Sequence, residues 1–471
     1  MPPPEGSAET AGAPGQGQLL SILGLGFGLA GAVGGTIGAG ILRTPGLVAA
    51  QLPSAPLVLA AWLVGGIYAL LGAVCIAELA TSLPQAGGWY VYAERAFGRR
   101  AGFLVGWTDW VAHCIGLAWV ATTVGEYGQA LLPNPFREGT TGAQALALLA
   151  IGLFTLIQLR GLRAGSTSQE LLSLAKAVAF LGLVAACFLL PAAGETPGAG
   201  LTTGLAAGLD TVTATVTAGG WRSLMVAVVL ALQAVITTYD GWASPVYFAE
   251  EFSQPERDLP RSLIGGVLAV GGLYLLINAA LLHVLPLPQL AGSPLPAALA
   301  ARALVGPAGG AVITAVALLA LLGLINTVVM AAPRILFGLG RAGLLPPLTA
   351  TLNAGGTPST ALLLTSGTGA LLVLAGSFDR LLGLGAVLYV TLPLAGIASL
   401  MVLRLREPEL PRPFRCWAYP LPPLLVGAVS VVFLAGMAVN DPLLCATAAM
   451  LVALGWPLSL LTQRQGEQAP G

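Results

Sequence analysis

Twelve apolar stretches, each about as long as a bilayer-spanning helix, follow one another along this sequence. A helix needs about 20 mainly apolar residues to cross the hydrocarbon core of a membrane. Only 8% of the 471 residues are charged and 56% are hydrophobic, whereas a soluble domain carries about 25% charged residues. We therefore predict an all-α membrane protein, with spans at roughly 18–52, 55–81, 101–132, 142–160, 169–191, 222–252, 262–286, 306–338, 359–376, 380–403, 421–439 and 442–462.

The basic residues are unevenly distributed among the connections between these stretches. If both termini are cytoplasmic, fourteen of the nineteen arginines fall in inside loops and five in outside loops. This is the asymmetry of the positive-inside rule, and it requires an even number of spans. We expect a multi-pass protein of the cell membrane with both termini in the cytoplasm. The inside set is Arg95, Arg99, Arg100, Arg160, Arg163, Arg257, Arg261, Arg334, Arg341, Arg404, Arg406, Arg412, Arg415 and Arg464, and the outside set is Arg43, Arg137, Arg222, Arg302 and Arg380.

Composition excludes several other kinds of protein. The net charge of zero gives no excess of positive charge that would favour binding to nucleic acid. The five cysteines are scattered without paired spacing, so they indicate neither a disulfide framework nor a zinc site, and no cofactor is implied. Residues 1–17 are rich in Pro and Gly and lack the basic start of a signal peptide. We expect a disordered tail at 1–17, one transmembrane domain over 18–464, and a short cytoplasmic tail over 465–471.

Two of the apolar stretches carry residues that oppose a continuous helix. In "AVGGTIGAGILRTP" (32–45), four glycines lie between residues 34 and 40, and each should cost a helix about 1 kcal/mol relative to Ala. The sixth stretch contains "ITTYDGWASP" (236–245). Breaks at corresponding positions of two halves indicate a transporter built from inverted repeats. The repeats would cover about 18–191 and 222–405, followed by two further helices over 421–462.

A break in a membrane helix creates a binding site for charged groups. It exposes N–H groups at the start of the second half-helix, which attract an anion, and carbonyls at the end of the first, which attract a cation. Two facing breaks would hold a zwitterion by both ends. The alternative is that the glycines serve only close helix packing, which explains one glycine-rich helix better than a matched pair.

Four stretches of this sequence resemble the amino acid–polyamine–organocation transporters, which share a fold of five plus five inverted helices with helices 1 and 6 broken. They are "GGTIGAGILRTPG", "AELATSLPQAGGWYVYAERAFG", "YDGWASPVYFAEEFSQPERDLPRSLI" and "RILFGLGRAGLLPPLTATLNAGGTP". Together they cover most of residues 18–360 in family order. The resemblance implies a secondary transporter of amino acids that works by alternating access.

The resemblance also implies where an amino acid would bind. Its carboxylate would meet backbone amides of the helix 1 break, and its ammonium would meet carbonyls of both breaks. The sequence departs from many family members at Ala39, where they have Ser, and at Thr237, where they have an aromatic residue. The expected substrate-binding set is Thr36, Ile37, Gly38, Ala39, Gly40, Ile41, Thr237, Thr238, Tyr239, Asp240 and Gly241.

Lys176 is the only lysine of the chain and lies within the fifth stretch. A charge at mid-bilayer is costly and usually faces the protein interior with a partner; the alternative is a lysine that snorkels to the headgroups. In sodium-independent members of the family, a lysine of helix 5 matches it. By that resemblance its ammonium would lie near helices 1 and 8, where sodium-coupled relatives bind an ion, and it is the expected coupling residue and a candidate proton carrier.

Other charges within the stretches leave their roles open. Asp109 and His113 are four residues apart and share a helix face, so they could relay protons or form a satisfied structural pair. Glu78, Glu250 and Glu251 lie beside arginine-rich segments and are expected to form structural or gating ion pairs.

Two other function classes, enzymes and channels, find little support in the sequence. An enzyme would need a nucleophile with a base or a cluster of metal ligands, and only two His are present, on different helices. A channel would need a filter of carbonyl or charge rings, and no such motif is present.

The substrate class depends on Asp240. If its side chain faces the site, cationic amino acids or polyamines are favoured; if it caps exposed amides instead, small neutral amino acids are favoured, which is the prediction we prefer.

Overall fold

The computed structural model describes residues 18–38, 40–131, 140–191, 220–293, 295–375 and 378–466. Ala39 and the predicted tail at 1–17 lie outside the described residues, as does most of the predicted tail at 465–471. The described elements are α1 Leu25–Thr36, α2 Gly40–Gln51, α3 Ala55–Ser82, α4 Trp89–Phe97, α5 Arg99–Leu131, α6 Thr140–Leu159, α7 Leu162–Leu189, α9 Trp221–Tyr239, η2 Ser244–Glu251, α10 Pro255–Val284, α11 Leu287–Ala291, α12 Pro296–Val305, α13 Ala308–Arg341, η3 Pro347–Ala350, α14 Ser359–Ala375, α15 Phe378–Arg406, α16 Leu421–Asn440 and α17 Pro442–Gly466.

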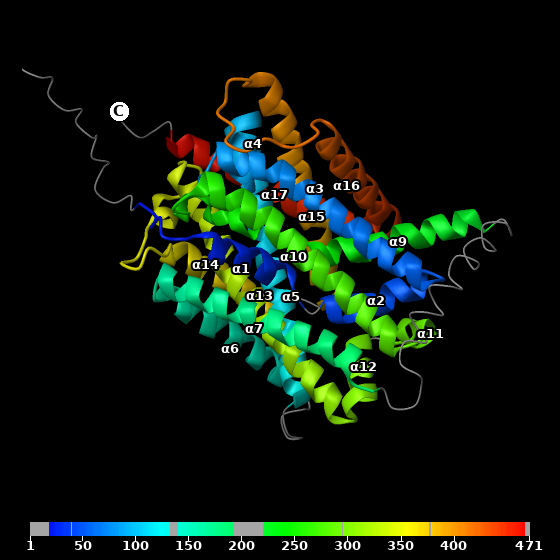
Figure 1. Cartoon of the computed structure of the whole chain (residues 1–471). Helices are drawn as coiled ribbons and strands as arrows, with labels where there is room; N and C mark the ends of the chain where they lie inside the picture. Colours follow the sequence, from blue (N-terminus) through cyan, green and yellow to red (C-terminus); the bar gives the residue numbers. More distant parts are fainter. Residues whose placement is uncertain are drawn as a thin grey trace, which may run out of the picture.

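The described part of the chain is helical, and its long helices are apolar enough to cross a membrane. Ten helices meet the length and hydropathy of a span, and α1 with α2 makes an eleventh when the bent pair is counted as one. Helix α14, the ninth predicted stretch, has 17 residues and is shorter than the others. In Figure 1, α3, α10 and α7 run with nearly the same slant through the molecule.

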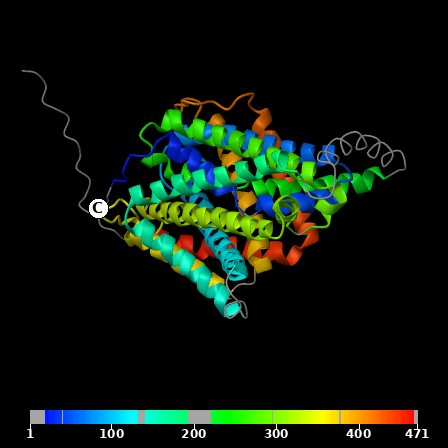
Figure 2. The same ribbon diagram turned by 60° about the horizontal axis from the view of Figure 1, so that its bottom comes forward.

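Helix packing gives the site its walls. Helix α10 packs against α3 and α1, while α5 packs against α13, α6 and α15. Helix α7 lies against α1 and α13, so the first half of the broken pair is enclosed. In both views the start of the described chain and the end of α17 lie at the same end of the molecule (Figures 1 and 2).

Both helices that were predicted to be broken are interrupted in the structure. Helix α1 ends at Thr36 and α2 begins at Gly40, with a bend of 48° between them. Helix α9 ends at Tyr239, and the chain resumes as the 3-10 helix η2 at Ser244. Non-helical backbone inside a membrane protein has to be buried or line a cavity, and the surroundings of these breaks meet that requirement.

Candidate functional site

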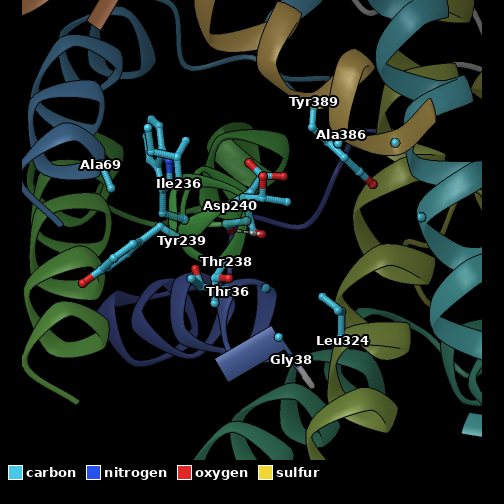
Figure 3. Close-up of a pocket in the computed structure, with 18 of the residues that line it drawn as sticks. Thr36, Gly38, Ala69, Ile236, Thr238, Tyr239, Asp240, Leu324, Ala386 and Tyr389 are labelled. Atoms are coloured by element: carbon cyan, nitrogen blue, oxygen red, sulfur yellow. Dashed lines mark hydrogen bonds between the residues drawn. The ribbon is translucent and has the colours of Figure 1, made fainter. Parts of the chain in front are cut away.

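A cavity of about 160 Å³ lies beside the two helix breaks (Figure 3). Eight of the eleven predicted binding residues line it: Thr36, Gly38, Gly40, Thr237, Thr238, Tyr239, Asp240 and Gly241. Ile37 and Ile41 are buried in the hydrophobic core and do not line the cavity. Ala39 lies outside the described residues. Two segments about 200 residues apart in sequence therefore meet at one cavity.

The glycines of the two breaks let the backbones touch. A Cβ placed on Gly241 would lie 2.1 Å from the carbonyl oxygen of Gly35, and a Cβ on Gly35 would lie 2.7 Å from the carbonyl oxygen of Gly241. Gly241 also has φ +102°, which L side chains rarely adopt. Close packing therefore accounts for Gly35 and Gly241, and these two glycines line the cavity together with Gly38 and Gly40. Close backbone packing and lining of the cavity therefore occur together at these breaks.

The helix ends at the breaks present complementary partial charges. Thr36 ends α1, so the last carbonyls of that helix lack an intrahelical partner. Gly40 begins α2, whose first N–H groups are likewise free of intrahelical bonds. Both residues line the cavity. Because a helix C-terminus favours a cation and an N-terminus an anion, this wall suits a molecule that carries both charges.

Tyr274 links the two breaks and was not identified from the sequence. Its hydroxyl lies 3.0 Å from the carbonyl oxygen of Thr36 and 3.2 Å from that of Thr238, and shares its proton between them. The side chains of Thr238 and Thr44 also bond at 2.8 Å, which joins the end of α9 to α2. A carbonyl oxygen accepts two hydrogen bonds, so each of these carbonyls retains capacity for an ammonium. The only available signal was that Tyr274 is the one tyrosine of its apolar stretch.

Lys176 is buried between three helices. Its Nζ donates to the carbonyl oxygens of Gly34 at 2.8 Å and Ile37 at 3.0 Å. A Cβ on Gly323 of α13 would lie 2.4 Å from its Cε, so the side chain lies between α7, α1 and α13. Helices α1 and α13 belong to the first and eighth predicted spans, so the expected location of the ammonium near them is confirmed. Because the side chain is 0% exposed, the snorkelling alternative is wrong.

Two more polar side chains of α7, which precede Lys176 in the sequence, contact α1. Ser173 Oγ donates to the carbonyl oxygen of Ala30 at 2.7 Å, and Gln169 Nε2 donates to the same oxygen at 3.2 Å. The amide oxygen of Gln169 accepts a bond from Asn326 of α13 at 2.8 Å. Buried polar groups need such partners. This row of donors holds α1 against α7 and α13.

Asp109 and His113 form the pair that their spacing predicted. His113 Nδ1 lies 3.0 Å from Asp109 Oδ1. The hydroxyl of Tyr247 donates to the same carboxylate oxygen at 3.0 Å and accepts a bond from Trp89 Nε1 at 2.9 Å. His113 lines the main cavity and also a smaller one of about 40 Å³ beside it. Asp240 lines both cavities too and is partly exposed.

The remaining walls of the main cavity come from small and apolar side chains. Ala69 of α3, Leu324 of α13 and Ala386 of α15 surround it in Figure 3, and Tyr389 closes one side. A Cβ on Gly116 of α5 would lie 2.3 Å from the Tyr389 hydroxyl, so this tyrosine is pressed against α5. The enclosed volume is smaller than the roughly 300 to 1,000 Å³ of pockets for drug-sized ligands.

The predicted ion pairs are confirmed. Glu78 pairs with Arg404 and Arg412, Glu250 with Arg341, and Glu251 with Arg334. The placement of Arg334 and Arg341 in an inside loop was wrong, because α13 continues to Arg341. Arg334 is instead a buried helix residue, 1% exposed, whose charge is neutralised by Glu251.

Comparisons with known proteins agree with this architecture. The family model described as amino acid permease matches residues 18–453. The serine/threonine exchanger SteT of Bacillus subtilis (strain 168) is 27% identical over 444 residues, which are 93% of this chain and 96% of that protein. The mouse Asc-type amino acid transporter 1 is 27% identical over 437 residues, 91% of this chain and 78% of that protein.

The mouse large neutral amino acids transporter small subunit 2 is also similar, with 27% identity over 448 residues that cover 91% of this chain and 78% of that protein. All three relatives are amino acid transporters or subunits of them by name. The family model covers nearly the whole described chain, including both helix breaks. The chain therefore belongs to the amino acid permease family of the amino acid–polyamine–organocation superfamily.

Proposed function

We propose that this protein is a sodium-independent secondary transporter that carries small neutral amino acids across the cell membrane by alternating access. The observation that carries the proposal is the cavity of about 160 Å³ between two broken helices. Its wall offers amide groups at Gly40 and carbonyls at Thr36 and Thr238. An amino acid has the matching carboxylate and ammonium, so backbone groups alone can hold both ends.

The size and chemistry of the cavity favour a short side chain. Ala69, Leu324 and Ala386 form apolar walls, and Tyr389 limits the depth. The name of the Bacillus subtilis relative points to serine and threonine, which have side chains of this size. Lys176 supports sodium independence, because its ammonium is bonded to two carbonyls of the α1 end where a cation would otherwise bind.

We further propose that the protein has twelve spans, with two inverted repeats at about 18–191 and 222–405 and both termini in the cytoplasm. Helix α14 would be the ninth span, since a helix of 17 residues measures about 25 Å, close to the hydrocarbon thickness of about 30 Å.

A second candidate function follows from Asp240. Its position on both cavity walls and its partial exposure favour a carrier of cationic amino acids or polyamines, because a carboxylate inside the membrane needs a cationic partner. His113, which lines the same two cavities, is one such partner within the protein. We prefer the neutral substrate for that reason.

Transport by the purified protein in liposomes tests both candidates. We expect saturable counterflow of labelled serine or alanine, unchanged when potassium replaces sodium, and displacement by serine, threonine and alanine. A channel would show no counterflow. If lysine or arginine displaces the label better than alanine does, and Asp240→Asn abolishes that preference, the cationic candidate replaces the neutral one.

A further inference from the structure

His113 lies between a buried carboxylate and the two cavities. Its ring lines both of them, while Asp109 is 0% exposed and lines neither. The ring is held in place by edge contacts with Tyr247, 5.0 Å between centroids, and Tyr389, 5.8 Å. The imidazole is therefore the part of the pair that a molecule in the cavity can reach.

The contacts of His113 fix which ring nitrogen carries a proton. Nδ1 lies 2.9 Å from the backbone carbonyl oxygen of Asp109 and 3.0 Å from its Oδ1. A carbonyl oxygen can only accept, so Nδ1 is the donor. A neutral imidazole has one donor and one acceptor, which leaves the lone pair on Nε2. No described residue forms a hydrogen bond with Nε2, and this nitrogen is therefore free to accept a proton.

The charged and titratable groups around the ring favour its protonated form. Asp109 faces it from α5, and Asp240 faces the same cavities from the end of α9. Tyr247 and Tyr389 are the titratable groups on η2 and α15, and Cys114 is the next residue of α5. Neither cavity is lined by a described lysine or arginine. One carboxylate therefore contacts the imidazole, and a second lines the same two cavities.

The environment of Asp109 also favours a positive charge on His113. Its Oδ1 accepts the Tyr247 hydroxyl, but its Oδ2 is buried and has no hydrogen-bond partner among the described residues. An ionised carboxylate left partly unsatisfied in a buried position is unfavourable unless a positive charge lies against it. A buried Asp that bonds to Nδ1 orients an imidazole and stabilises its imidazolium form in enzyme active sites, and Asp109 contacts the same ring nitrogen of His113.

We propose that Nε2 of His113 binds a proton from the substrate cavity, and that this proton crosses the membrane together with the amino acid. The protein would then be a proton-coupled transporter, with His113 as the proton-binding residue and Asp109 as the residue that positions it. The inference rests on the proposed function, because the proton and the amino acid share one cavity. Lys176 does not line that cavity, and its ammonium is bonded to two carbonyls of α1 and the break after it.

Net uptake into substrate-free liposomes tests the coupling. With an acidic exterior and a neutral interior, the wild type should take up labelled serine several-fold faster than without the gradient, and a protonophore should remove the difference. His113→Gln should lose this stimulation, since a glutamine amide cannot be protonated at these pH values. His283→Gln is the matched control, because His283 is at the end of α10 against Phe188 and should keep the wild-type response.

Direct proton counting provides the second measurement and does not depend on the folding of a His113 variant. In weakly buffered detergent solution with a pH-sensitive dye, serine should cause the wild type to take up about one proton per protein. Asp109→Asn should shift the gradient response to more acidic exteriors, because the imidazolium loses its counter-ion.

The proposal is overturned if serine causes no proton uptake by the wild type, if the gradient leaves wild-type uptake unchanged, or if His113→Gln keeps the stimulation. Failure of the proposed function is a different result, namely the absence of saturable counterflow in the wild type at every pH.

Discussion

At the scale of single residues, Gly241 is a position where an added side chain is poorly tolerated. Its φ of +102° is rare for residues with a side chain, and a Cβ at this position would lie only 2.1 Å from the carbonyl oxygen of Gly35. We predict that Gly241→Ala lowers the melting temperature in detergent and abolishes serine binding, because strained backbone costs about 1 to 3 kcal/mol and the two breaks must separate. Gly272→Ala on α10 is the control, since its Cβ would meet nothing within 4 Å. Equal stability of the two variants would contradict the close backbone contact.

Lys176 gives a second prediction at this scale. Its removal leaves the carbonyls of Gly34 and Ile37 buried without their donor, and each unsatisfied buried group costs about 1 to 3 kcal/mol. We predict that Lys176→Ala remains folded in detergent but reduces the serine exchange rate at least tenfold, since the end of α1 is no longer held. Wild-type exchange should be equal in sodium and potassium. Strong stimulation by sodium, or full activity of Lys176→Ala, would show that Lys176 does not replace a cation.

At the scale of elements, ion pairs of different burial should contribute differently to stability. The Glu251–Arg334 pair joins η2 to α13, with side chains 0% and 1% exposed. Removal of one partner of such a pair typically costs about 3 to 5 kcal/mol, because the other charge remains buried. We predict that Glu251→Gln strongly lowers the melting temperature of the purified protein.

The exposed pair Arg95–Glu407 is the matched comparison, because the Arg95 side chain is 54% exposed and such pairs contribute about 0 to 1 kcal/mol. Arg95→Ala should therefore leave the melting temperature nearly unchanged. If the two substitutions have equal effects, η2 is not held to α13 through this pair.

The long helices could be predicted from sequence because the bilayer restricts the backbone. The predicted stretches 55–81 and 359–376 correspond to α3 (Ala55–Ser82) and α14 (Ser359–Ala375). The length of an apolar stretch in the hydropathy pattern gives the length of the span. Because backbone polar groups inside the bilayer must be hydrogen-bonded within the segment, such a stretch forms a helix. The short helices α4, α11 and α12 lie between such stretches and were not predicted, because their positions depend on tertiary packing.

Side-chain partners across helices were also beyond the sequence. The sequence predicted no partner for Cys75 or Cys416, yet their sulfur atoms lie 3.8 Å apart as free thiols. The backbone N–H of Cys416 donates to Glu78, which brings the segment after α15 to the end of α3. Spacing reveals partners within one helix, as for Asp109 and His113, because periodicity fixes them. Partners hundreds of residues apart depend on how the helices pack.

At the scale of the whole molecule, three arginines of the inside set make contacts at one end of the structure. Arg95 pairs with Glu407, Arg406 donates to the carbonyl oxygen of Ala96, and Arg99 donates to that of Ala342. These contacts join α4 to the end of α15, and the start of α5 to the end of α13. Figure 1 shows α4 at the opposite end of the molecule from α11 and α12, and α12 carries Arg302 of the outside set.

This charge separation predicts the orientation in the membrane. Lysine and arginine close to the ends of spans are retained in the cytoplasm, so the end with α4 should be cytoplasmic and both termini should lie on that side. Alkaline phosphatase, which is active only outside the cytoplasm, should be inactive when fused to either terminus in a bacterial host. Fused after Asp441, between α16 and α17, it should be active. The reverse pattern would invert the topology, and activity at one terminus alone would require an odd number of spans, which the arginine distribution does not allow.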